Sequence, residues 1–277
     1  MPPVPADRLR PRRPRSARPP AGGFGEALAR LYDIDLEDDP GDLDLYRALV
    51  ARSGGPVLEL AVGTGRLAVP LAADGATVVG VDHDAAMLAR ARARAERARL
   101  APDRLLLVEG DLRTTDVPFA GSFRLAFIAL NSLMLLAGRA EQAAAIRSLA
   151  ERLGPDGLAV VDVWLPDADD LVRFDGRLVL EYVRDRADGT ILTKTAAARH
   201  DAATGAVDLT AIYDESRDGV AVGRWIRRDR LRLVSADDLA AFAEAAGLEI
   251  EVIAGGYDLE PLGPGADRAV LLARRPA

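Results

Sequence analysis

The chain contains no cysteine, so disulfide bonds, thiolate zinc sites and cysteine nucleophiles are excluded. Histidine is almost as scarce, because it occurs only as His83 and His200. A histidine-rich metal site and most histidine-dependent hydrolase mechanisms are therefore disfavoured, and we expect no bound metal.

Long hydrophobic runs are also missing. No apolar segment approaches the ~18–20 residues that a membrane-spanning helix requires. No apolar stretch typical of a secretion signal follows the basic start of the sequence. We therefore expect a soluble, cytoplasmic protein with no membrane partner.

The charge is unevenly distributed along the chain. The whole sequence carries −7, but residues 1–20 carry +5 and the remainder carries −12. An acidic body argues against broad binding to nucleic acid phosphates, so no nucleic acid partner is expected. Residues 1–22 include seven prolines and show no apolar periodicity, which predicts a disordered Pro/Arg-rich tail.

The remaining sequence is rich enough in apolar residues to form a large core. The 277 residues are 49% apolar, which suits one large α/β domain or one domain with an insertion. Apolar runs at 57–62, 77–81, 105–108, 124–130 and 158–163 alternate with helical patterns. The helices are expected at 24–32, 42–53, 66–73, 84–99 and 139–153. Near-continuous apolar strands between helices predict a parallel sheet covered on both faces.

The pattern changes after residue 165. Runs with period-2 character at 178–183, 190–198, 207–213 and 222–233 are separated by glycine-containing turns, which predicts an inserted antiparallel sheet. A helix over 235–247 and strands over 248–253 and 269–273 then return to the core. We therefore expect residues 23–165 and 235–277 to form the core and residues 166–234 to form the insert.

The segment from Glu59 to Gly65, with the sequence Glu-Leu-Ala-Val-Gly-Thr-Gly, is the most informative motif. An apolar strand ends in a glycine-rich turn, and a helical pattern follows. Glycine lacks a Cβ and tolerates positive φ, so Gly63 and Gly65 let the backbone approach a ligand closely. The N-terminal N–H groups of the following helix would point to the same place.

Polar residues also follow the next three strands. Asp82 ends the second strand, where a carboxylate can hold ribose hydroxyls, and Asp84 is available to cap the next helix. Asp111 follows the third strand, and Asn131 follows the fourth. Such strand ends predict a cofactor site.

These motifs resemble those of the class I S-adenosylmethionine (SAM) dependent methyltransferases of the small-molecule type. The resemblance implies a Rossmann-like, seven-stranded sheet with helices on both faces and a reversed last strand, in addition to the inserted antiparallel sheet. It also implies SAM as the cofactor. Ala61 stands where the family most often has its first glycine.

The resemblance assigns roles around the first strand and its turn. The Gly63–Gly65 backbone, which includes Thr64, would face the methionine part of SAM. Glu59 would order the turn or help to bind the amino group of SAM. Tyr32, in a helix before the core, would pack over the cofactor.

Further roles follow for the next three strand ends. Asp82 would hold both ribose hydroxyls, and His83 and Met87 would flank the adenine. Asp111 would accept a hydrogen bond from the adenine amino group, while the Leu112 backbone N–H meets a ring nitrogen. The loop at Asn131 would lie beside the sulfonium and the acceptor.

Two other functions remain open from the sequence. The segment from Gly63 to Ala68 also fits the G-x-G-x-x-A fingerprint, and Asp82 could bind a nicotinamide cofactor, so an NAD(P)-dependent oxidoreductase is one alternative. Glu59 would place negative charge near a pyrophosphate, and Asp111 has no standard role in such an enzyme. A non-catalytic SAM-binding or dimerisation module is the second alternative.

The acceptor is expected to be a small molecule, with an amine slightly favoured over a hydroxyl. An amine needs only to be neutral, whereas a hydroxyl needs a base. Asn131 and His200 are the candidate catalytic residues, and no firm assignment is made. The insert would cover the acceptor or form the contact of a homodimer. Other polar residues that could line the acceptor pocket are Tyr182, Tyr213, Glu215 and Tyr257.

Overall fold

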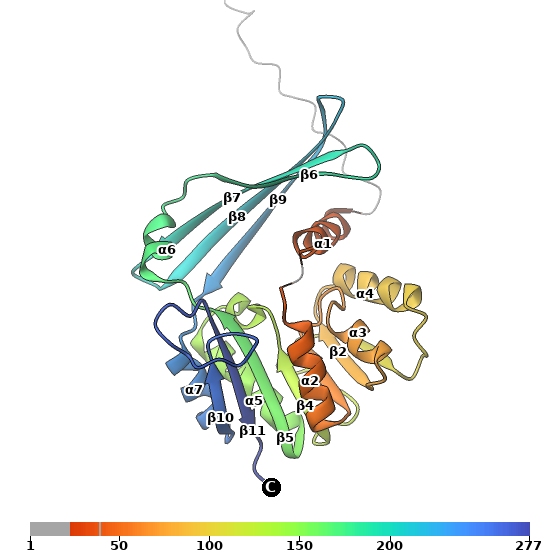
Figure 1. Ribbon diagram of the computed structural model, residues 1–277, viewed down its shortest axis with the longest axis vertical. Coiled ribbons are helices and arrows are strands. Elements are labelled where there is room, and N and C mark those ends of the chain that lie inside the picture. The colour runs from red at the N-terminus through yellow and green to blue at the C-terminus, as the bar shows by residue number, and fades with distance from the viewer. Residues whose placement is uncertain (1–22, 39) are drawn as a thin grey trace, which may run out of the picture.

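The computed structural model describes residues 23–38 and 40–277, so the predicted tail over residues 1–22 lies outside the described residues. The described chain forms a mixed α/β core and a separate antiparallel sheet (Figure 1). This arrangement confirms the predicted fold class. No described helix is long and apolar enough to span a bilayer.

The core sheet has seven strands in the order β10-β11-β5-β4-β1-β2-β3. Strands β1 to β5 run parallel, whereas β11 is antiparallel to both of its neighbours, as predicted for the reversed last strand. The strands span Val57–Leu60 (β1), Val78–Asp82 (β2), Leu105–Glu109 (β3), Phe123–Ile128 (β4), Leu153–Trp164 (β5), Glu249–Ala254 (β10) and Arg268–Arg274 (β11).

Helices cover both faces of this sheet, which explains its nearly continuous apolar strands. Helices α2, α3 and α4 pack on one face, and α5 and α7 pack on the other. For example, Phe127 of β4 packs against Tyr46 of α2, with ring centroids 4.4 Å apart. The helices span Leu43–Ser53 (α2), Ala68–Ala73 (α3), Ala85–Arg97 (α4), Arg139–Arg152 (α5) and Ala236–Ala245 (α7).

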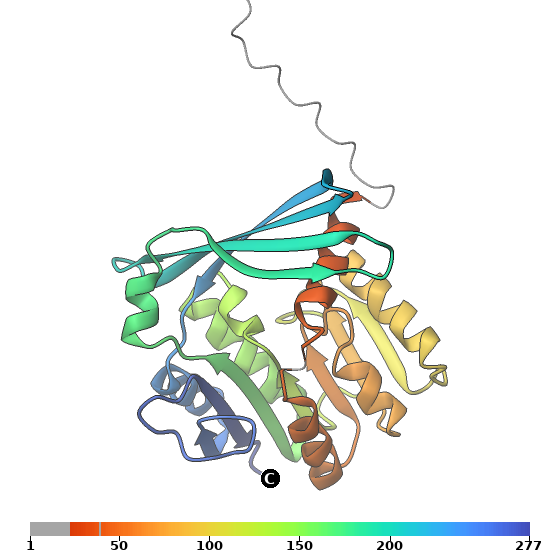
Figure 2. The ribbon, with the colours of Figure 1, turned by 45° about the horizontal axis from the view of Figure 1, so that its top comes forward.

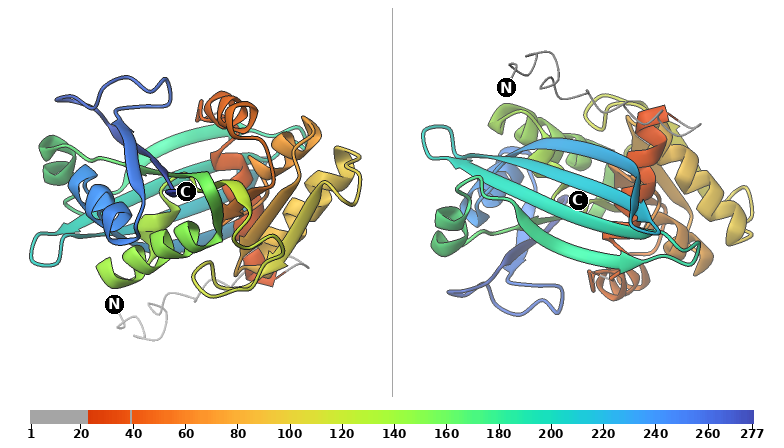
Figure 3. Two further views of the ribbon diagram at one scale, coloured as in Figure 1. Left: turned by 90° about the horizontal axis from the view of Figure 1, so that it is seen from below. Right: turned by 90° about the horizontal axis from the view of Figure 1, so that it is seen from above.

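The second sheet has four antiparallel strands in the order β6-β7-β8-β9. It lies across the end of the core at which the parallel strands finish (Figures 2 and 3). Its hairpins turn at Gly189, Gly205 and Gly219, which all have positive φ. The strands span Val179–Asp185 (β6), Ile191–Asp201 (β7), Ala206–Arg217 (β8) and Val220–Arg232 (β9).

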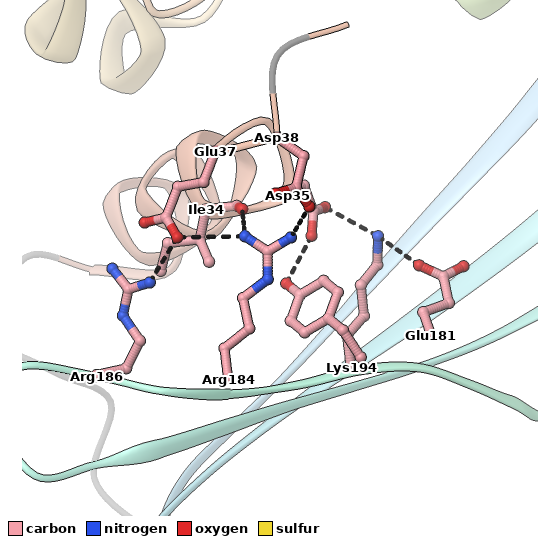
Figure 4. A network of polar contacts seen from close by, with 9 residues as sticks. Ile34, Asp35, Glu37, Asp38, Glu181, Arg184, Arg186 and Lys194 are labelled. Atoms are coloured by element: carbon pink, nitrogen blue, oxygen red, sulfur yellow. Dashed lines mark hydrogen bonds and ion pairs between the residues drawn. The ribbon is translucent and has the colours of Figure 1, made fainter.

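Helix α1, which spans Gly23–Asp35, packs against the second sheet. Its apolar residues Leu31 and Ile34 pack against Tyr213 and Trp225 of the second sheet. At its C-terminal end, Asp35 belongs to a network of ion pairs and hydrogen bonds with β6 and β7 (Figure 4). Helix α1 is therefore fixed to the second sheet by both apolar and polar contacts.

Some predicted boundaries were wrong by a few residues, because the backbone leaves the regular conformation early. Strand β1 ends at Leu60 rather than at 62, since Ala61 has φ of 62°. Strand β4 ends at Ile128 rather than at 130, since Leu130 and Asn131 have φ of 51° and 66°. The sequence also missed two short helices, α6 over Ala168–Arg173 and the 3-10 helix η2 over Ser132–Leu135.

Candidate functional site

A cleft of 630 Å³ opens where the parallel strands of the core end. Parallel α/β sheets bind ligands at this edge, because the loops that follow the strands meet there. The cleft is bounded by the core on one side and by α1 and β9 on the other. Its lining residues are Leu28, Tyr32, Ala61, Gly63, Asp82, His83, Asp84, Met87, Asp111, Leu112, Arg113, Ser132, Leu135, Leu136, Ile226, Arg227, Arg228 and Asp229.

The two glycines of the turn after β1 have different roles. Gly63 lines the cleft with φ of 54°, and a Cβ at this position would meet no atom within 4 Å. Gly65 has φ of 73° and does not line the cleft, but a Cβ there would lie 3.2 Å from the Cβ of Ala91 in α4. Gly63 thus leaves space for a ligand, whereas Gly65 permits close helix packing.

Asp82 connects this turn to the end of β2. Its Oδ2 accepts a hydrogen bond from the Gly63 N–H at 2.8 Å, and its Oδ1 accepts one from the Asp84 N–H at 2.9 Å. The residue is 8% exposed and lines the cleft. Because each carboxylate oxygen can accept a second hydrogen bond, Asp82 can still bind ligand hydroxyls. The predicted cap is also confirmed, since Asp84 accepts from the N–H groups of Ala86 and Met87.

The third strand end presents an ion pair rather than a free carboxylate. The Arg113 guanidinium donates to both oxygens of Asp111, with its Nε 2.9 Å from Oδ1 and its Nη2 2.6 Å from Oδ2. Hydrogen bonding from Arg113 lowers the pKa of Asp111 to about 2. Arg113 also pairs with Glu141 at 3.1 Å. Asp111 is therefore ionised at neutral pH, and the sequence analysis had not included Arg113 in the site.

Glu59 lies behind the turn and does not line the cleft. Burial raises the pKa of Glu59 to about 8, although the nearby Arg66 opposes this shift. Arg66 itself donates to both oxygens of the buried Asp42, at 2.5 and 2.6 Å. The Oε2 of Glu59 and the Oγ1 of Thr64 are buried without a hydrogen-bond partner among the described residues. The site thus retains buried polar atoms next to the glycine turn.

The fourth strand end is held by β5. Asp162 accepts a hydrogen bond from the Leu130 N–H at 2.9 Å, and the Asn131 Oδ1 accepts one from the Trp164 N–H at 2.5 Å. The side chain of Asn131 therefore holds the loop, and it does not line the cleft. Tyr257 donates to the same Asp162 at 3.0 Å and lies away from the cleft as well.

The remaining candidate acceptor residues do not line the cleft. The hydroxyls of Tyr182 and Tyr213 donate to Asp35 at 2.7 and 2.5 Å. Glu215 forms an ion pair with Arg30 at 2.6 Å. His200 lies on β7 opposite Val207. These side chains of the second sheet either anchor α1 or lie away from the cleft.

Strand β9 contributes lining residues that the sequence analysis had not identified. Arg227 forms an ion pair with Asp229 at 2.7 Å, and its guanidinium carbon lies 5.9 Å from the ring centroid of Tyr32. Ile226 and Arg228 complete this part of the cleft. The sequence pattern that could have identified these residues is the group of five arginines within residues 224–232, in a segment whose alternation otherwise predicts a strand.

Known proteins share this arrangement. A family model described as a methyltransferase domain matches residues 57–157. The chain is 30% identical over 213 residues to a cypemycin N-terminal methyltransferase of Streptomyces sp, which covers 75% of this chain and 78% of that one. It is 29% identical over 254 residues to a dTDP-3-amino-3,6-dideoxy-alpha-D-glucopyranose N,N-dimethyltransferase of Streptomyces fradiae. That alignment covers 87% of this chain and 91% of the relative. The solved structure of the CcbJ methyltransferase from Streptomyces caelestis superposes with a TM-score of 0.69 and 27% identity, covering 85% of this chain and 96% of that one.

Proposed function

The chain belongs to the class I SAM-dependent methyltransferases that act on small molecules, and on that premise we propose that it methylates an amine nitrogen. Membership of this family excludes the two alternatives that the sequence left open, which were a nicotinamide enzyme and a non-catalytic module. Two of the relatives are named as an N-terminal methyltransferase and an N,N-dimethyltransferase, which supports the amine.

The cleft has the features that SAM requires. The open space at Gly63 admits a ligand close to the backbone, and Asp82 retains capacity for ribose hydroxyls. We propose that Tyr32, His83, Met87, Asp111 and Leu112, which line the same cleft, hold the adenosine part. Glu59, Ala61, Thr64, Gly65 and Asn131 would shape this site, mostly from behind its surface. SAM supplies an activated methyl group on a positively charged sulfur.

The protein then needs mainly to orient the acceptor and to exclude water. Well-oriented intramolecular reactions show that positioning alone can supply roughly 7–11 kcal/mol of the barrier. Leu28 of α1 and Leu135 and Leu136 at η2 give the cleft apolar walls around the polar cofactor residues. These walls are suited to excluding water from the reacting atoms.

The groups around the cleft favour an amine over a hydroxyl acceptor. A hydroxyl would need a base to remove its proton. Asp111 and Asp229 are each paired with an arginine, and both oxygens of Asp82 accept backbone hydrogen bonds. His200, the one histidine outside the cofactor motifs, is not a lining residue. An amine acceptor needs only to be neutral when it attacks.

Labelled SAM and matched pairs of acceptors test this proposal. Each pair differs only by an amine or a hydroxyl, for example an amino sugar and its parent sugar, or by a free or acetylated N-terminus in a short peptide. We expect label transfer to the free amine of at least one pair and not to its partner. Transfer to hydroxyls alone, or no transfer to any amine by a protein that binds S-adenosylhomocysteine, would contradict the proposal.

The insert and the assembly state belong to the same proposal. We propose that residues 23–165 and 235–277 hold the cofactor, while residues 166–234 cover the acceptor, because β9 lines the cleft. Val183 and Val222 are exposed on the face of the second sheet that is turned away from α1. These apolar side chains support a homodimer through that face. Light scattering of the wild type and of Val183→Asp should give dimer and monomer masses respectively.

A further inference from the structure

The edge of the second sheet forms one wall of the cleft. Ile226, Arg227, Arg228 and Asp229 are consecutive, yet all four line it. Successive side chains of a strand point to opposite faces, so consecutive residues can line one cleft only along the edge of a sheet. Strand β9 is one of the two edge strands of its sheet. The cleft therefore continues from the cofactor residues around the edge of β9.

Arg228 differs from the other arginines of this strand. Arg224 pairs with Asp214, Arg227 pairs with Asp229, and Arg230 lies 3.6 Å from the nearest oxygens of two aspartates. Arg232 donates to the carbonyl of Ala137 at 3.0 Å. Among the described residues, no carboxylate or carbonyl oxygen pairs with the exposed Arg228.

The charges around the cleft indicate what the unpaired guanidinium of Arg228 can bind. The cleft is lined by four carboxylates, and its other two arginines, Arg113 and Arg227, are each paired with one of them. The chain as a whole carries −7, so its general field repels anions. An acceptor with an anionic group therefore needs a local cation. A guanidinium is well suited, because its planar N–H groups match carboxylate and phosphate oxygens.

We propose that Arg228 binds an oxyanion group of the acceptor, a phosphate or a carboxylate, at a point away from the amine that is methylated. This inference rests on the proposed function, because it concerns the acceptor half of the same cleft. Arg228 then selects acceptors that carry both an amine and an anionic group. Arg227 is less suited to this role, because its Nε pairs with Asp229, which balances its charge, and its guanidinium carbon lies 5.9 Å from the ring centroid of Tyr32.

Two glutamine variants separate this role from general electrostatics. Arg228→Gln removes the free cation. Arg224→Gln is the matched control, because Arg224 lies on the same face of the same strand but is paired with Asp214 and lies outside the cleft. Calorimetry with the protein saturated by S-adenosylhomocysteine measures the binding of pyrophosphate and of succinate at low ionic strength. The probe that binds with the higher affinity indicates whether the oxyanion is a phosphate or a carboxylate.

We expect the wild type to bind at least one probe, Arg228→Gln to bind it about tenfold more weakly or worse, and Arg224→Gln to match the wild type. S-adenosylhomocysteine should bind equally to all three proteins. The inference is overturned if the wild type binds neither probe or if both variants weaken binding equally. It is also overturned if Arg228→Gln weakens S-adenosylhomocysteine, because Arg228 would then serve the cofactor. A wild type that fails to bind S-adenosylhomocysteine would instead refute the proposed function.

Discussion

At the residue scale, Asp82 links the glycine turn to the space proposed for the ribose. Its carboxylate is buried, yet it lines the cleft and holds both the Gly63 and the Asp84 backbone N–H groups. A single side chain therefore orders the glycine turn and also faces the space proposed for the ribose. The effect of its removal should combine lost ligand contacts with a less ordered turn.

We predict that Asp82→Ala weakens S-adenosylhomocysteine binding by about 1–3 kcal/mol, the scale of a lost hydrogen bond to a buried charge. Titration calorimetry measures the change. Asp44→Ala is the control, because that side chain is 94% exposed and does not line the cleft, so its affinity for S-adenosylhomocysteine should not change. Equal dissociation constants for the wild type and Asp82→Ala would count against the cofactor assignment.

Glu59 should make the stability of the ligand-free protein depend on pH. Its pKa is about 8 in the folded protein and about 4.5 when exposed, because burial disfavours the charged form. Its contribution to stability is fully present below pH 4.5 and is lost as the pH rises through about 8. Within this window the free energy of unfolding should fall by up to about 1.4 kcal/mol per pH unit from this group.

Urea unfolding of the wild type and of Glu59→Gln at several pH values across that window measures this contribution. The glutamine variant has the same shape but no titrating proton, so its free energy of unfolding should fall less steeply with pH. Parallel curves for the two proteins would mean that Glu59 does not titrate in this range.

At the scale of elements, helix α1 joins the side of the cleft proposed for the cofactor to the second sheet. Asp33 pairs with Arg90 and Arg94 of α4 at 2.5 and 2.9 Å, so α1 is also fixed to the core. Asp35, two residues later, binds side chains of the second sheet (Figure 4). Tyr32 of the same helix lines the cleft. The position of Tyr32 thus depends on contacts to both sheets.

We predict that Asp35→Ala lowers the free energy of unfolding by about 1–3 kcal/mol, because two tyrosine hydroxyls and Lys194 lose their shared partner in a half-buried site. S-adenosylhomocysteine affinity should fall as well, since α1 carries Tyr32. Asp38→Ala is the control: its side chain is 89% exposed and pairs with Arg184, so a change within about 0.5 kcal/mol is expected. Chemical denaturation and calorimetry measure both quantities, and equal effects of the two variants would contradict the anchoring role.

At the scale of the whole molecule, part of the second sheet is buried in the same hydrophobic cluster as the core sheet. Val207 of β8 and Leu231 of β9 are buried in the same cluster as Ile146 and Leu149 of α5. At this end the second sheet therefore depends on the core for burial of its inner face, whereas α1 covers Tyr213 and Trp225. We expect the two parts to unfold together.

Circular dichroism and tryptophan fluorescence should report one coincident unfolding transition, because Trp225 lies in the second sheet and Trp164 lies in the core. Val207→Ala should shift that whole transition and lower the free energy of unfolding by about 1–3 kcal/mol. Val222→Ala, on the exposed face of the same sheet, should change it by less than about 0.5 kcal/mol. Two separate transitions, with only one shifted by Val207→Ala, would show that the insert folds independently.

The part of the cleft proposed to bind the cofactor was largely predictable from the sequence, because most of it is built from strand ends. Tyr32, Gly63, Asp82 and Asp111 line one cleft, as the motifs implied. The acceptor side was not predictable, because polar residues of the second sheet have partners far away in the sequence. The Tyr182 and Tyr213 hydroxyls bind Asp35 across 147 and 178 residues.

By itself, the sequence determined the alternation of strands and helices, the glycine turn and the carboxylates at the strand ends. These features follow from local periodicity and from the rule that parallel strands end at one edge of their sheet. Only the tertiary structure decided which face of the second sheet meets the cleft, and which arginine of β9 is left without a partner. Pairing between distant side chains depends on how the two sheets pack, and local sequence patterns do not encode that packing.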